Sequence, residues 1–507
     1  MSDPSKNRKS RRERRRRKAK PTPEITQINR QIPIYEILQP EGVELIHQKS
    51  LEVLAEVGVD FYLEEAREIL QANGARVEGE TAYLSADVIE EHLSKAPSQF
   101  TQIARNPDNN VVIGGKNAVF APVYGPPFVY DLEGGRRDAT LEDFQNFVKL
   151  AYLSPYIHHS GGTIVEPTDE PSETRHLDML YSHIKYSDKP FMGAVMAHDH
   201  AEDSVKMVEI LHGKEAVREN PALISLINIS SPRRLDDRML EALTVYAKAR
   251  QAVIITPFIM AGAMSPVSLA GTLIQQNAEA LAGLTYAQMV EPGTPVVYGS
   301  FMTNVDLKSG APVFGSPESQ MALLASAQMA KRYGIPFRSG GMFASSKVID
   351  AQAAYESVMT MLPAVLGRVH FVLHAAGWLE NGMTAGYEKF LLDCELLGMY
   401  HTLSEGIDFS EDALAMDSLR NVKPGGHHLG TPHTMRNFHD AFYRTELFDY
   451  KDIDQWVEEG SVTAAEAAAE KVKTLLAEYQ APELDEDLDQ ELLDFMTRRK
   501  EEIGREE

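Results

Sequence analysis

The sequence predicts an α/β protein whose main domain is a TIM (β/α)8 barrel. Eight short apolar runs, often rich in Val, Ile or Phe, alternate with longer amphipathic stretches between about residues 117 and 403. Strands that are apolar throughout and separated by helices form parallel sheets covered by helices, and eight such units suffice to close a barrel. An open, doubly wound sheet is the alternative. The predicted strands are Ala118–Tyr124, Tyr156–Ile164, Pro190–Ala197, Ala222–Ile229, Ala252–Phe258, Pro295–Phe301, Pro336–Gly340 and Val369–His374.

Helical periodicity and capping signals place helices between these strands. Thr140, with Asp143 three residues later, has the pattern of a capping box. The pairs Ser231-Pro232, Ser265-Pro266 and Ser316-Pro317 each predict a helix that starts near the proline. The predicted helices include Leu141–Leu153, Ala201–Leu211, Leu235–Ala249, Glu318–Arg332, Ala351–Leu366 and Tyr387–Leu403.

Regions of different composition flank the predicted barrel at residues 117–403. Residues 1–32 contain a run of Lys and Arg without an apolar segment, and we expect a disordered basic tail. Residues 33–116 predict helices and short extended pieces, which form an N-terminal helical cap on the barrel. Residues 404–507 predict a C-terminal helical extension, and its charged end from Asp485 onward is expected to be a solvated acidic tail.

Composition restricts the compartment and the ligands. The only cysteine of the 507 residues is Cys394, which excludes internal disulfides and cysteine-cluster metal sites and favours the cytoplasm. The net charge is −24 although the tail is basic, so the body is strongly acidic. An acidic body disfavours nucleic acid and mildly favours cationic ligands. Residues 251–278 lack charged side chains, but Pro257, Pro266 and two glycines interrupt them, so no membrane span is expected.

Arg338 is the first candidate site residue. The active site of a TIM barrel lies in the loops that follow the strands, and Arg338 lies in the short seventh strand. A guanidinium buried there needs an anion, and a ligand carboxylate would supply a bidentate partner. The alternative is an internal ion pair with a protein carboxylate such as Asp350 or Asp131.

Histidines, aromatic residues and one amide at the strand ends complete the candidate site. His374 ends the eighth strand and is the candidate for positioning a ligand. His158 and His159 point to opposite faces of a strand, so at most one of them reaches the ligand. Aromatic rings at the mouth would attract a quaternary ammonium by cation–π interaction. The candidate ligand-binding residues are therefore Arg338, Tyr124, Phe128, His158, Asn228, Phe301 and Trp378.

A metal or nucleotide site is not expected. His427, His428 and His433 have a spacing that invites a zinc interpretation, but they follow the last strand and have only Asp440 nearby in the sequence. Neither a Walker A loop nor a strand-coupled GxGxxG occurs.

Four segments resemble one known family. They are residues 339–356 (SGGMFASSKVIDAQAAYE), 374–380 (HAAGWLE), 387–395 (YEKFLLDCE) and 425–430 (GGHHLG), the last followed by His433-Thr434. Together they resemble the trimethylamine methyltransferase (MttB) superfamily, and the likeness runs from about residue 35 to residue 480.

This resemblance implies a TIM barrel that passes the methyl group of a methylated amine to Co(I). The cobalamin belongs to a separate corrinoid protein, so the chain itself is expected to bind no cofactor. Trimethylamine-specific members carry pyrrolysine, whereas this sequence contains only the standard residues. A quaternary amine has a neutral amine as its leaving group and needs no activating electrophile. We therefore expect a carboxylated quaternary amine, such as glycine betaine or proline betaine, whose carboxylate binds Arg338.

Other functions stay open at this point. The chain could act on trimethylamine itself, or it could be a barrel lyase or aldolase with a Schiff base at Lys347 or with His374 as general base. It could also be a non-catalytic betaine-binding protein. The sequence leaves self-association into a homo-oligomer open.

Overall fold

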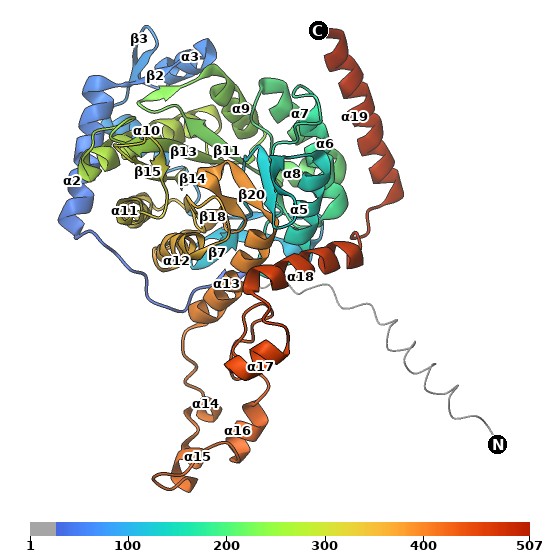
Figure 1. The fold of residues 1–507 in the computed structure, drawn as a ribbon. Helices are drawn as coiled ribbons and strands as arrows, with labels where there is room; N and C mark the ends of the chain where they lie inside the picture. The colour runs from blue at the N-terminus through green and yellow to red at the C-terminus, as the bar shows by residue number, and fades with distance from the viewer. Residues whose placement is uncertain (1–26, 507) are drawn as a thin grey trace.

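A curled, mostly parallel sheet lies at the centre of the molecule and helices surround it (Figure 1). The computed structural model describes residues 27–506. Across the sheet, parallel strands lie in the order β7 (Asn117–Phe120), β18 (Phe371–Leu373), β17 (Phe337–Gly340), β14 (Val296–Gly299), β13 (Ala252–Ala261), β11 (Leu223–Ile229) and β10 (Phe191–Met192). The helices around it are α5 (Leu141–Leu153), α6 (Arg175–Tyr186), α7 (His198–His212), α8 (Lys214–Glu219), α9 (Asp237–Lys248), α10 (Leu269–Val290), α11 (Pro317–Tyr333), α12 (Ala351–Leu366) and α13 (Tyr387–Glu405). The predicted α/β class is confirmed.

Residues 156–164 lie between β7 and β10 in space but do not form a strand, so the prediction of a strand at Tyr156–Ile164 is wrong. The amides of His158 and His159 both donate to the Phe120 carbonyl, at 3.0 and 3.2 Å, instead of alternating as in a ladder. The segment still bonds to both neighbours, since the Ser160 amide donates to the Pro190 carbonyl at 2.8 Å and Gly161 accepts from the Met192 amide at 2.8 Å.

Alternate side chains of the strands fill the inner face of the curled sheet. They form one apolar cluster, which includes Val119, Met192, Ile224, Leu226, Ile254, Val297 and Phe371. The hairpin of β5 (Gln99–Gln102) and β6 (Val111–Gly114) adds Phe100 and Ile113 to this cluster. Gln102 donates to the carbonyls of Phe191 and Ala222. The hairpin therefore closes the end of the sheet where the strands begin.

The helix starts that the capping signals predicted are confirmed in some cases and wrong in others. The capping box of Thr140 and Asp143 is present, and Ser316 caps α11 with Pro317 in its first turn. The start at Ser265-Pro266 is wrong, because α10 begins at Leu269, after Ser268. The Ser265 hydroxyl contacts the Thr272 hydroxyl instead of capping an amide. The helix after Ser231-Pro232 is α9, whose cap is Asp236.

The N-terminal region packs on one side of this body. It comprises α2 (Pro40–Glu52), the π-helical turn η1 (Val53–Val57), α3 (Glu64–Ala72), α4 (Ala86–Leu93), the 3-10 turn η2 (Pro107–Asn109) and the strands β2 (Val59–Phe61), β3 (Arg76–Glu78) and β4 (Thr81–Tyr83). These strands join β12 (Arg234–Leu235) of the body in a sheet with the order β12, β2, β4, β3. Residues 1–26 of the predicted tail lie outside the described residues. Its end is not disordered, because β1 (Ile28–Asn29) pairs with β7 and Ile28 is buried.

Further strands lie beyond the ends of the central strands. β15 (Phe301–Val305) continues from β14 beside β13 and pairs with β16 (Pro312–Val313). A second sheet has the order β19 (Trp378–Leu379), β20 (Thr384–Gly386), β8 (Phe128–Asp131), β9 (Gly135–Asp138), with the 3-10 turn η3 (Glu380–Gly382) between β19 and β20. Within the described part of the chain, we find no helix with the length and apolar character that a membrane span requires.

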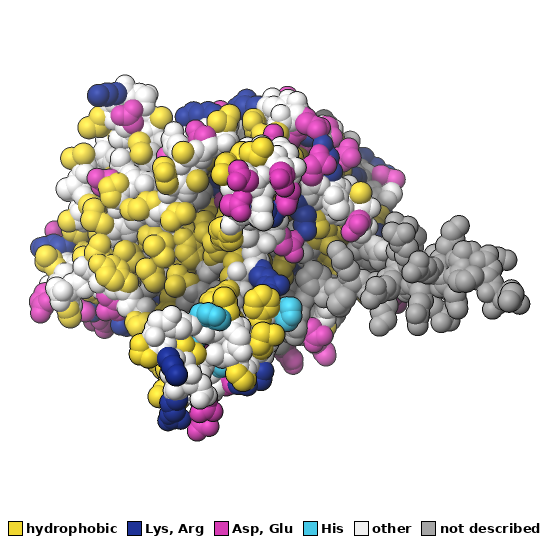
Figure 2. Space-filling view, turned by 60° about the horizontal axis from the view of Figure 1, so that its bottom comes forward, with side chains coloured by type: hydrophobic (Ala, Val, Ile, Leu, Met, Phe, Trp, Pro, Cys, Tyr) yellow, Lys and Arg dark blue, Asp and Glu magenta, His cyan; other side chains and the backbone are white. Residues whose placement is uncertain are grey.

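The C-terminal region leaves the body and returns to it (Figure 1). After α13 the chain runs outward through the short helices α14 (Glu411–Leu414), α15 (Met416–Asn421), α16 (Pro432–Asn437) and α17 (Ile453–Glu458). We call residues 406–462 the arm. Figure 2 shows the arm standing out from the surface next to a broad hydrophobic area. Helix α18 (Ala464–Glu478) then packs on α13 and α5.

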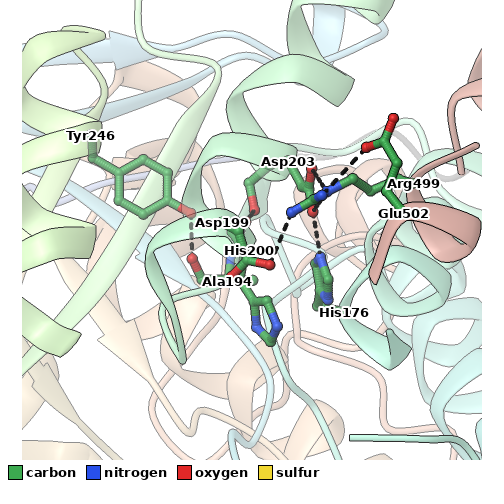
Figure 3. Close-up of polar contacts among 9 residues, drawn as sticks. His176, Ala194, Asp199, His200, Asp203, Tyr246, Arg499 and Glu502 are labelled. Atoms are coloured by element: carbon green, nitrogen blue, oxygen red, sulfur yellow. Dashed lines mark hydrogen bonds and ion pairs between the residues drawn. The ribbon is translucent and has the colours of Figure 1, made fainter. Parts of the chain in front are cut away.

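The last helix, α19 (Glu486–Glu506), is not the solvated tail that its charge predicted. Leu492, Met496 and Ile503 are buried on one side of it. From the same side Arg499 donates to Asp203 at 3.0 and 3.1 Å and to Asp199 at 2.9 Å, both on α7 (Figure 3). The spacing of these residues forms a narrow helical stripe, which the surrounding charges mask in the sequence.

Candidate functional site

Arg338 lies on the inner face of the sheet, near the ends of the strands. Its strand neighbours in register are Gly299 and Phe371, and Phe371 belongs to the inner cluster. The side chain is 1% exposed, and burial lowers the pKa of the guanidinium to about 9. Its Nε and Nη1 atoms are buried without a hydrogen-bond partner. Such unpaired donors are costly, which indicates that an acceptor binds there.

His374 adds a further donor to this position. Its Nδ1 accepts the Tyr124 amide at 3.2 Å, and its Nε2 lies 3.2 Å from Nη2 of Arg338. Burial, followed by the charge of Arg338, holds the pKa of His374 well below its usual range, so the ring is neutral. A neutral ring whose Nδ1 accepts carries its proton on Nε2. Arg338 and His374 therefore turn N–H groups toward each other, and an anion between them would accept from both.

Protein carboxylates do not supply that anion. The alternative partners Asp350 and Asp131 are both occupied elsewhere. Asp350 caps α12 by accepting from the Ala353 amide at 2.9 Å, and Asp131 accepts from the Glu133 amide at 3.0 Å in the β8–β9 turn. Arg338 forms no ion pair among residues 27–506. The internal pair considered from the sequence is therefore absent.

Aromatic rings surround His374. Its ring centroid lies 4.5 Å from that of Trp378, 5.5 Å from that of Phe301 and 5.5 Å from that of Phe343. Phe314 joins the group at 5.2 Å from Trp378. The Arg338 guanidinium lies 5.5 Å from the Phe301 centroid. The sequence predicted Phe301 and Trp378, whereas Phe314 and Phe343 were missed because they lie in loops outside the strand ends.

Local contacts explain why the segments that carry the family resemblance build this cluster. A Cβ atom on Gly340 would lie 2.1 Å from the Phe343 ring, so only glycine lets this ring pack over β17. Glu356 on α12 accepts from the Ser345 amide at 2.6 Å and fixes the same loop. On the other side, the Gly377 amide donates to the buried Asp393 at 2.8 Å, which holds the turn before Trp378.

A polar row continues from Arg338 across the inner face. Asn228 of β11 pairs in register with Thr256 of β13. The Thr256 hydroxyl is buried without a partner and lies over Gly299, whose Cβ position is 2.0 Å from it. Asn228 has the parity of the inner residue Leu226 and is exposed, so the inner face is open at this level. The sequence predicted Asn228 but missed Thr256, although the strand parity of Thr256 could have indicated it.

The remaining predicted residues are Tyr124, Phe128 and His158, and their surroundings differ. Tyr124 packs against the inner cluster, and burial raises the pKa of its hydroxyl to about 12. The Phe128 ring is covered instead by Arg136, whose guanidinium lies 3.5 Å from the ring centroid. His158 contacts Phe120 and His401 of α13, so it belongs to the helical layer. His159 instead contacts the inner residue Phe371 at 5.2 Å, which makes it the inward histidine.

The residues considered for other chemistry do not form sites. Among residues 27–506 no three or more His, Cys, Asp or Glu side chains gather as metal ligands. His428 contacts the Ser418 hydroxyl at 2.8 Å on the arm. Lys347 is exposed and donates to the Ser345 carbonyl at 2.9 Å, so it lacks the desolvated pocket that activates an amine nucleophile.

Four large apolar side chains are exposed in segments that follow strands, and we call them the apolar rim: Met196, Val267, Leu307 and Met383. Exposed apolar side chains at one end of a sheet are typical of a surface for a binding partner. Arg338 and His374 lie in or directly after strands β17 and β18, near the same ends of the strands.

Comparison with known proteins identifies the family. The family model "Trimethylamine methyltransferase (MTTB)" matches residues 5–504. The chain belongs to the trimethylamine methyltransferase family. The family and the methyltransferase class predicted from the sequence motifs are therefore confirmed.

Individual relatives cover most of the chain. It is 48% identical to the glycine betaine methyltransferase of Desulfitobacterium hafniense (strain Y51), over 94% of this chain and 99% of that protein. It is 30% identical to the proline betaine:corrinoid methyltransferase of Eubacterium limosum, over 87% of this chain and 93% of that protein. It is also 30% identical to the trimethylamine methyltransferase MttB of Methanosarcina thermophila, over 88% and 94%. Among solved structures, the monomethylamine methyltransferase (MtmB) of Methanosarcina barkeri matches with a TM-score of 0.48 and 10% identity, over 92% and 93%.

Proposed function

We propose that this chain transfers a methyl group from a carboxylated quaternary amine of the glycine betaine type to the Co(I) corrinoid of a partner protein. The observation that carries the proposal is the Arg338–His374 pair, which presents buried N–H donors without an acceptor. A betaine carboxylate would accept from both side chains. The names of the relatives that act on glycine betaine and proline betaine support this substrate class.

The chain's residues bind and align the substrate. Arg338 and the Nε2 proton of His374 hold the carboxylate, while Phe301 and Trp378 face the ammonium end by cation–π interaction. The partner's corrinoid supplies the nucleophile. The bond between the methyl carbon and nitrogen breaks, and its electron pair stays on nitrogen, so the product is a neutral tertiary amine. The step needs no proton from the chain, and alignment is the main catalytic contribution.

The apolar rim of Met196, Val267, Leu307 and Met383 supports docking of the corrinoid protein at the open end of the sheet. We infer that the sheet is a (β/α)8 barrel in which the backbone bonds of residues 158–161 to β7 and β10 take the place of a regular second strand. We also propose residues 33–116, 117–403 and 404–507 as cap, barrel and extension. The only cysteine, Cys394, is buried and free, and we propose the cytoplasm as compartment.

The deciding experiment mixes the purified protein with a Co(I) corrinoid protein and one methylated amine at a time. Glycine betaine or proline betaine should convert the cobalt spectrum from Co(I) to the methylated form, and trimethylamine should not. Conversion by trimethylamine at the rate of every betaine would overturn the substrate assignment. If no methylated amine is converted while betaine binds by calorimetry, the chain is a non-catalytic binding protein.

The variant Arg338→Lys tests the carboxylate contact within that reaction. Lysine keeps the charge but loses the planar fork, so KM for the betaine should rise about 100-fold with a smaller change in kcat. Unchanged betaine turnover in this variant would show that the carboxylate binds elsewhere.

A further inference from the structure

A cavity of about 160 Å³ lies at the end of the sheet where the strands begin, opposite the end at which Arg338 meets His374. Its walls come from the β5–β6 hairpin, the end of α11, the start of β17 and the segment between α12 and β18. A single water molecule needs only about 15 Å³, so the cavity has room for a small ligand. Its polar lining consists of Ser98, Gln99, Lys331, Arg368 and His370.

Arg368 brings an unpaired cation to this cavity. Its Nε atom is buried without a hydrogen-bond partner, and within residues 27–506 no carboxylate forms an ion pair with its guanidinium. A helix C-terminus attracts cations, but the carbonyls of Pro363, Ala364 and Leu366 at the end of α12 already accept backbone amides, at 2.7, 3.3 and 3.0 Å. Capping of α12 therefore does not explain this side chain.

Arg250 is the counterpart of Arg368 at the end of α9. Both arginines follow the last turn of a helix and precede a strand of the central sheet. Both also have a positive φ, 56° for Arg250 and 64° for Arg368, in the region that favours glycine. Arg250 lies 3.3 Å from Glu291, so the fold itself pairs its charge. Arg368 occupies the same strained position without such a pair, which favours a role in binding a ligand.

A second buried arginine makes the surroundings of Arg368 more positive. Arg30 is 4% exposed, and its Nε atom also lacks a hydrogen-bond partner, although its other nitrogens donate to the carbonyls of Asn117 and Val369. Burial, and then the charge of Arg368, lowers the pKa of Arg30 to about 9. Burial, followed by both arginines, lowers the pKa of His370 to about 3, so this ring is neutral. The two guanidinium groups therefore act on each other and on His370 without a carboxylate between them.

The charge of this cluster indicates the class of ligand. Lys331 also lines the cavity, but it pairs with Glu36 at 2.5 Å, which leaves Arg30 and Arg368 without a counter-charge. Buried cations are normally paired, so an anion is the expected ligand. A phosphate group carries about −1.5 to −2 at pH 7 and has three acceptor oxygens, whereas a carboxylate carries a single charge. Two guanidinium groups therefore match a phosphate better than a carboxylate.

We infer that this cavity binds a phosphate group, either of a small phosphorylated molecule or as free phosphate. Arg368 is the principal binding residue, and Arg30 supplies the second positive charge. Ser98 and Gln99 of the hairpin line the same cavity and add neutral donors. The inference is independent of the substrate assignment, because the cavity lies at the other end of the sheet and Arg338 does not line it.

Calorimetry of the full-length protein in phosphate-free buffer tests the ligand class. Inorganic phosphate, glycerol phosphate and acetate are each titrated at the same ionic strength, set with chloride. At least one of the two phosphates should bind, and acetate should bind at least about 10-fold more weakly because it carries less charge. Tighter binding of glycerol phosphate would assign a phosphorylated molecule, and tighter binding of inorganic phosphate would assign free phosphate. Binding of neither, or equal binding of phosphate and acetate, would contradict the inference.

Variants place the bound phosphate in the cavity. Arg368→Asn removes the guanidinium and tolerates the positive φ, so the protein should fold and bind phosphate at least about 10-fold more weakly. Arg250→Asn makes the same change at the paired counterpart and should leave phosphate binding unchanged. Gln99→Glu puts a carboxylate of nearly the same shape into the cavity, so it should also weaken phosphate binding and should raise the Tm without ligand.

Arg338→Met separates the cavity from the proposed substrate site. This variant should bind phosphate as the wild-type protein does, even if it no longer binds betaine. Loss of phosphate binding in Arg338→Met would place the phosphate at the substrate site and overturn the inference. Equal phosphate binding by wild-type and Arg368→Asn protein would overturn it as well.

Discussion

Arg338 and Arg499 are both largely removed from solvent, but their surroundings are opposite. Arg499 on α19 contacts Asp203 and Asp199 and so attaches the last helix to α7. Arg338 has no carboxylate partner and faces the N–H of His374. Buried charges in proteins are normally paired within the fold. An arginine paired by the fold stabilises structure, whereas one left unpaired by the fold indicates a ligand that brings the missing charge.

The largest expected effect comes from Arg338→Met. Glycine betaine binding should weaken about 1000-fold, because the carboxylate loses its charged partner. The free energy of unfolding without ligand should rise by about 1 kcal/mol, since an unpaired buried charge is replaced by an apolar chain. Calorimetry and urea unfolding measure the two quantities. A destabilised protein would mean that Arg338 has a structural partner.

Arg499→Met should have the reverse effect. Removing the guanidinium leaves the nearly buried Asp203 without its cation, so the free energy of unfolding should fall by about 3 kcal/mol. Methyl-transfer KM should not change, because Arg499 lies on the outer layer. Arg505→Met is the matched control, since its pair with Glu501 is exposed and worth less than about 0.5 kcal/mol. Equal stabilities of the two variants would remove the contrast with Arg338.

Phe301→Leu should sharpen the comparison at the ammonium end of the ligand. Loss of the aromatic face should weaken glycine betaine binding about 10-fold. Binding of 3,3-dimethylbutyrate, which has the same shape without the positive charge, should change less. Phe128→Leu is the control, because its ring is covered by Arg136 instead of facing the site. If the Phe128 variant weakens betaine binding as much as the Phe301 variant, the aromatic cluster is not the ammonium site.

The smallest effect concerns pH. Burial and then Arg338 hold the pKa of His374 well below its usual range, so below about pH 6.5 the unfolded chain binds a proton that the folded chain does not. Stability is therefore lost as pH falls below 6.5. Arg338→Met removes the second of the two causes, so the loss of stability between pH 6.5 and 5 should become smaller.

His200, which lies beside the Arg499 contacts, is the histidine whose contribution to the pH dependence of stability should stay the same in that experiment. Its pKa is lowered to about 4 by burial and by His176, neither of which Arg338→Met alters. Urea unfolding at pH 7, 6 and 5 gives the slope of the free energy of unfolding against pH for each protein. An identical slope in wild type and Arg338→Met would show that Arg338 does not influence His374.

Much of the fold follows from sequence periodicity, as two helices illustrate. The bounds of α5 and α12 match their predicted bounds, because apolar spacing and a capping residue determine both ends. By contrast, Tyr156–Ile164 is apolar enough for a strand, but the imidazoles of His158 and His159 accept backbone amides and replace the ladder. A local pattern does not reveal such side-chain competition.

The candidate site was predictable where it depends on strand ends and not where it depends on loops. Arg338 and His374 lie in or directly after a strand, so parity and position indicated them. Phe314 and Phe343 come from separate loops and meet only in the folded chain. The sequence also does not show whether Arg338 has an internal partner, because Asp350 and Asp131 are equally available in it. Only the folded structure shows that neither carboxylate contacts Arg338.

The β5–β6 hairpin constrains the order of catalytic events. Phe100 and Ile113 close the end of the sheet where the strands begin, so under the proposed function the substrate enters and the product leaves by the same open end at which the corrinoid protein docks. The amine must then load before the corrinoid protein covers that end, and the demethylated product must wait for it to leave. Steady-state kinetics should then follow a compulsory order, with high concentrations of Co(I) corrinoid protein inhibiting turnover by capping the empty enzyme.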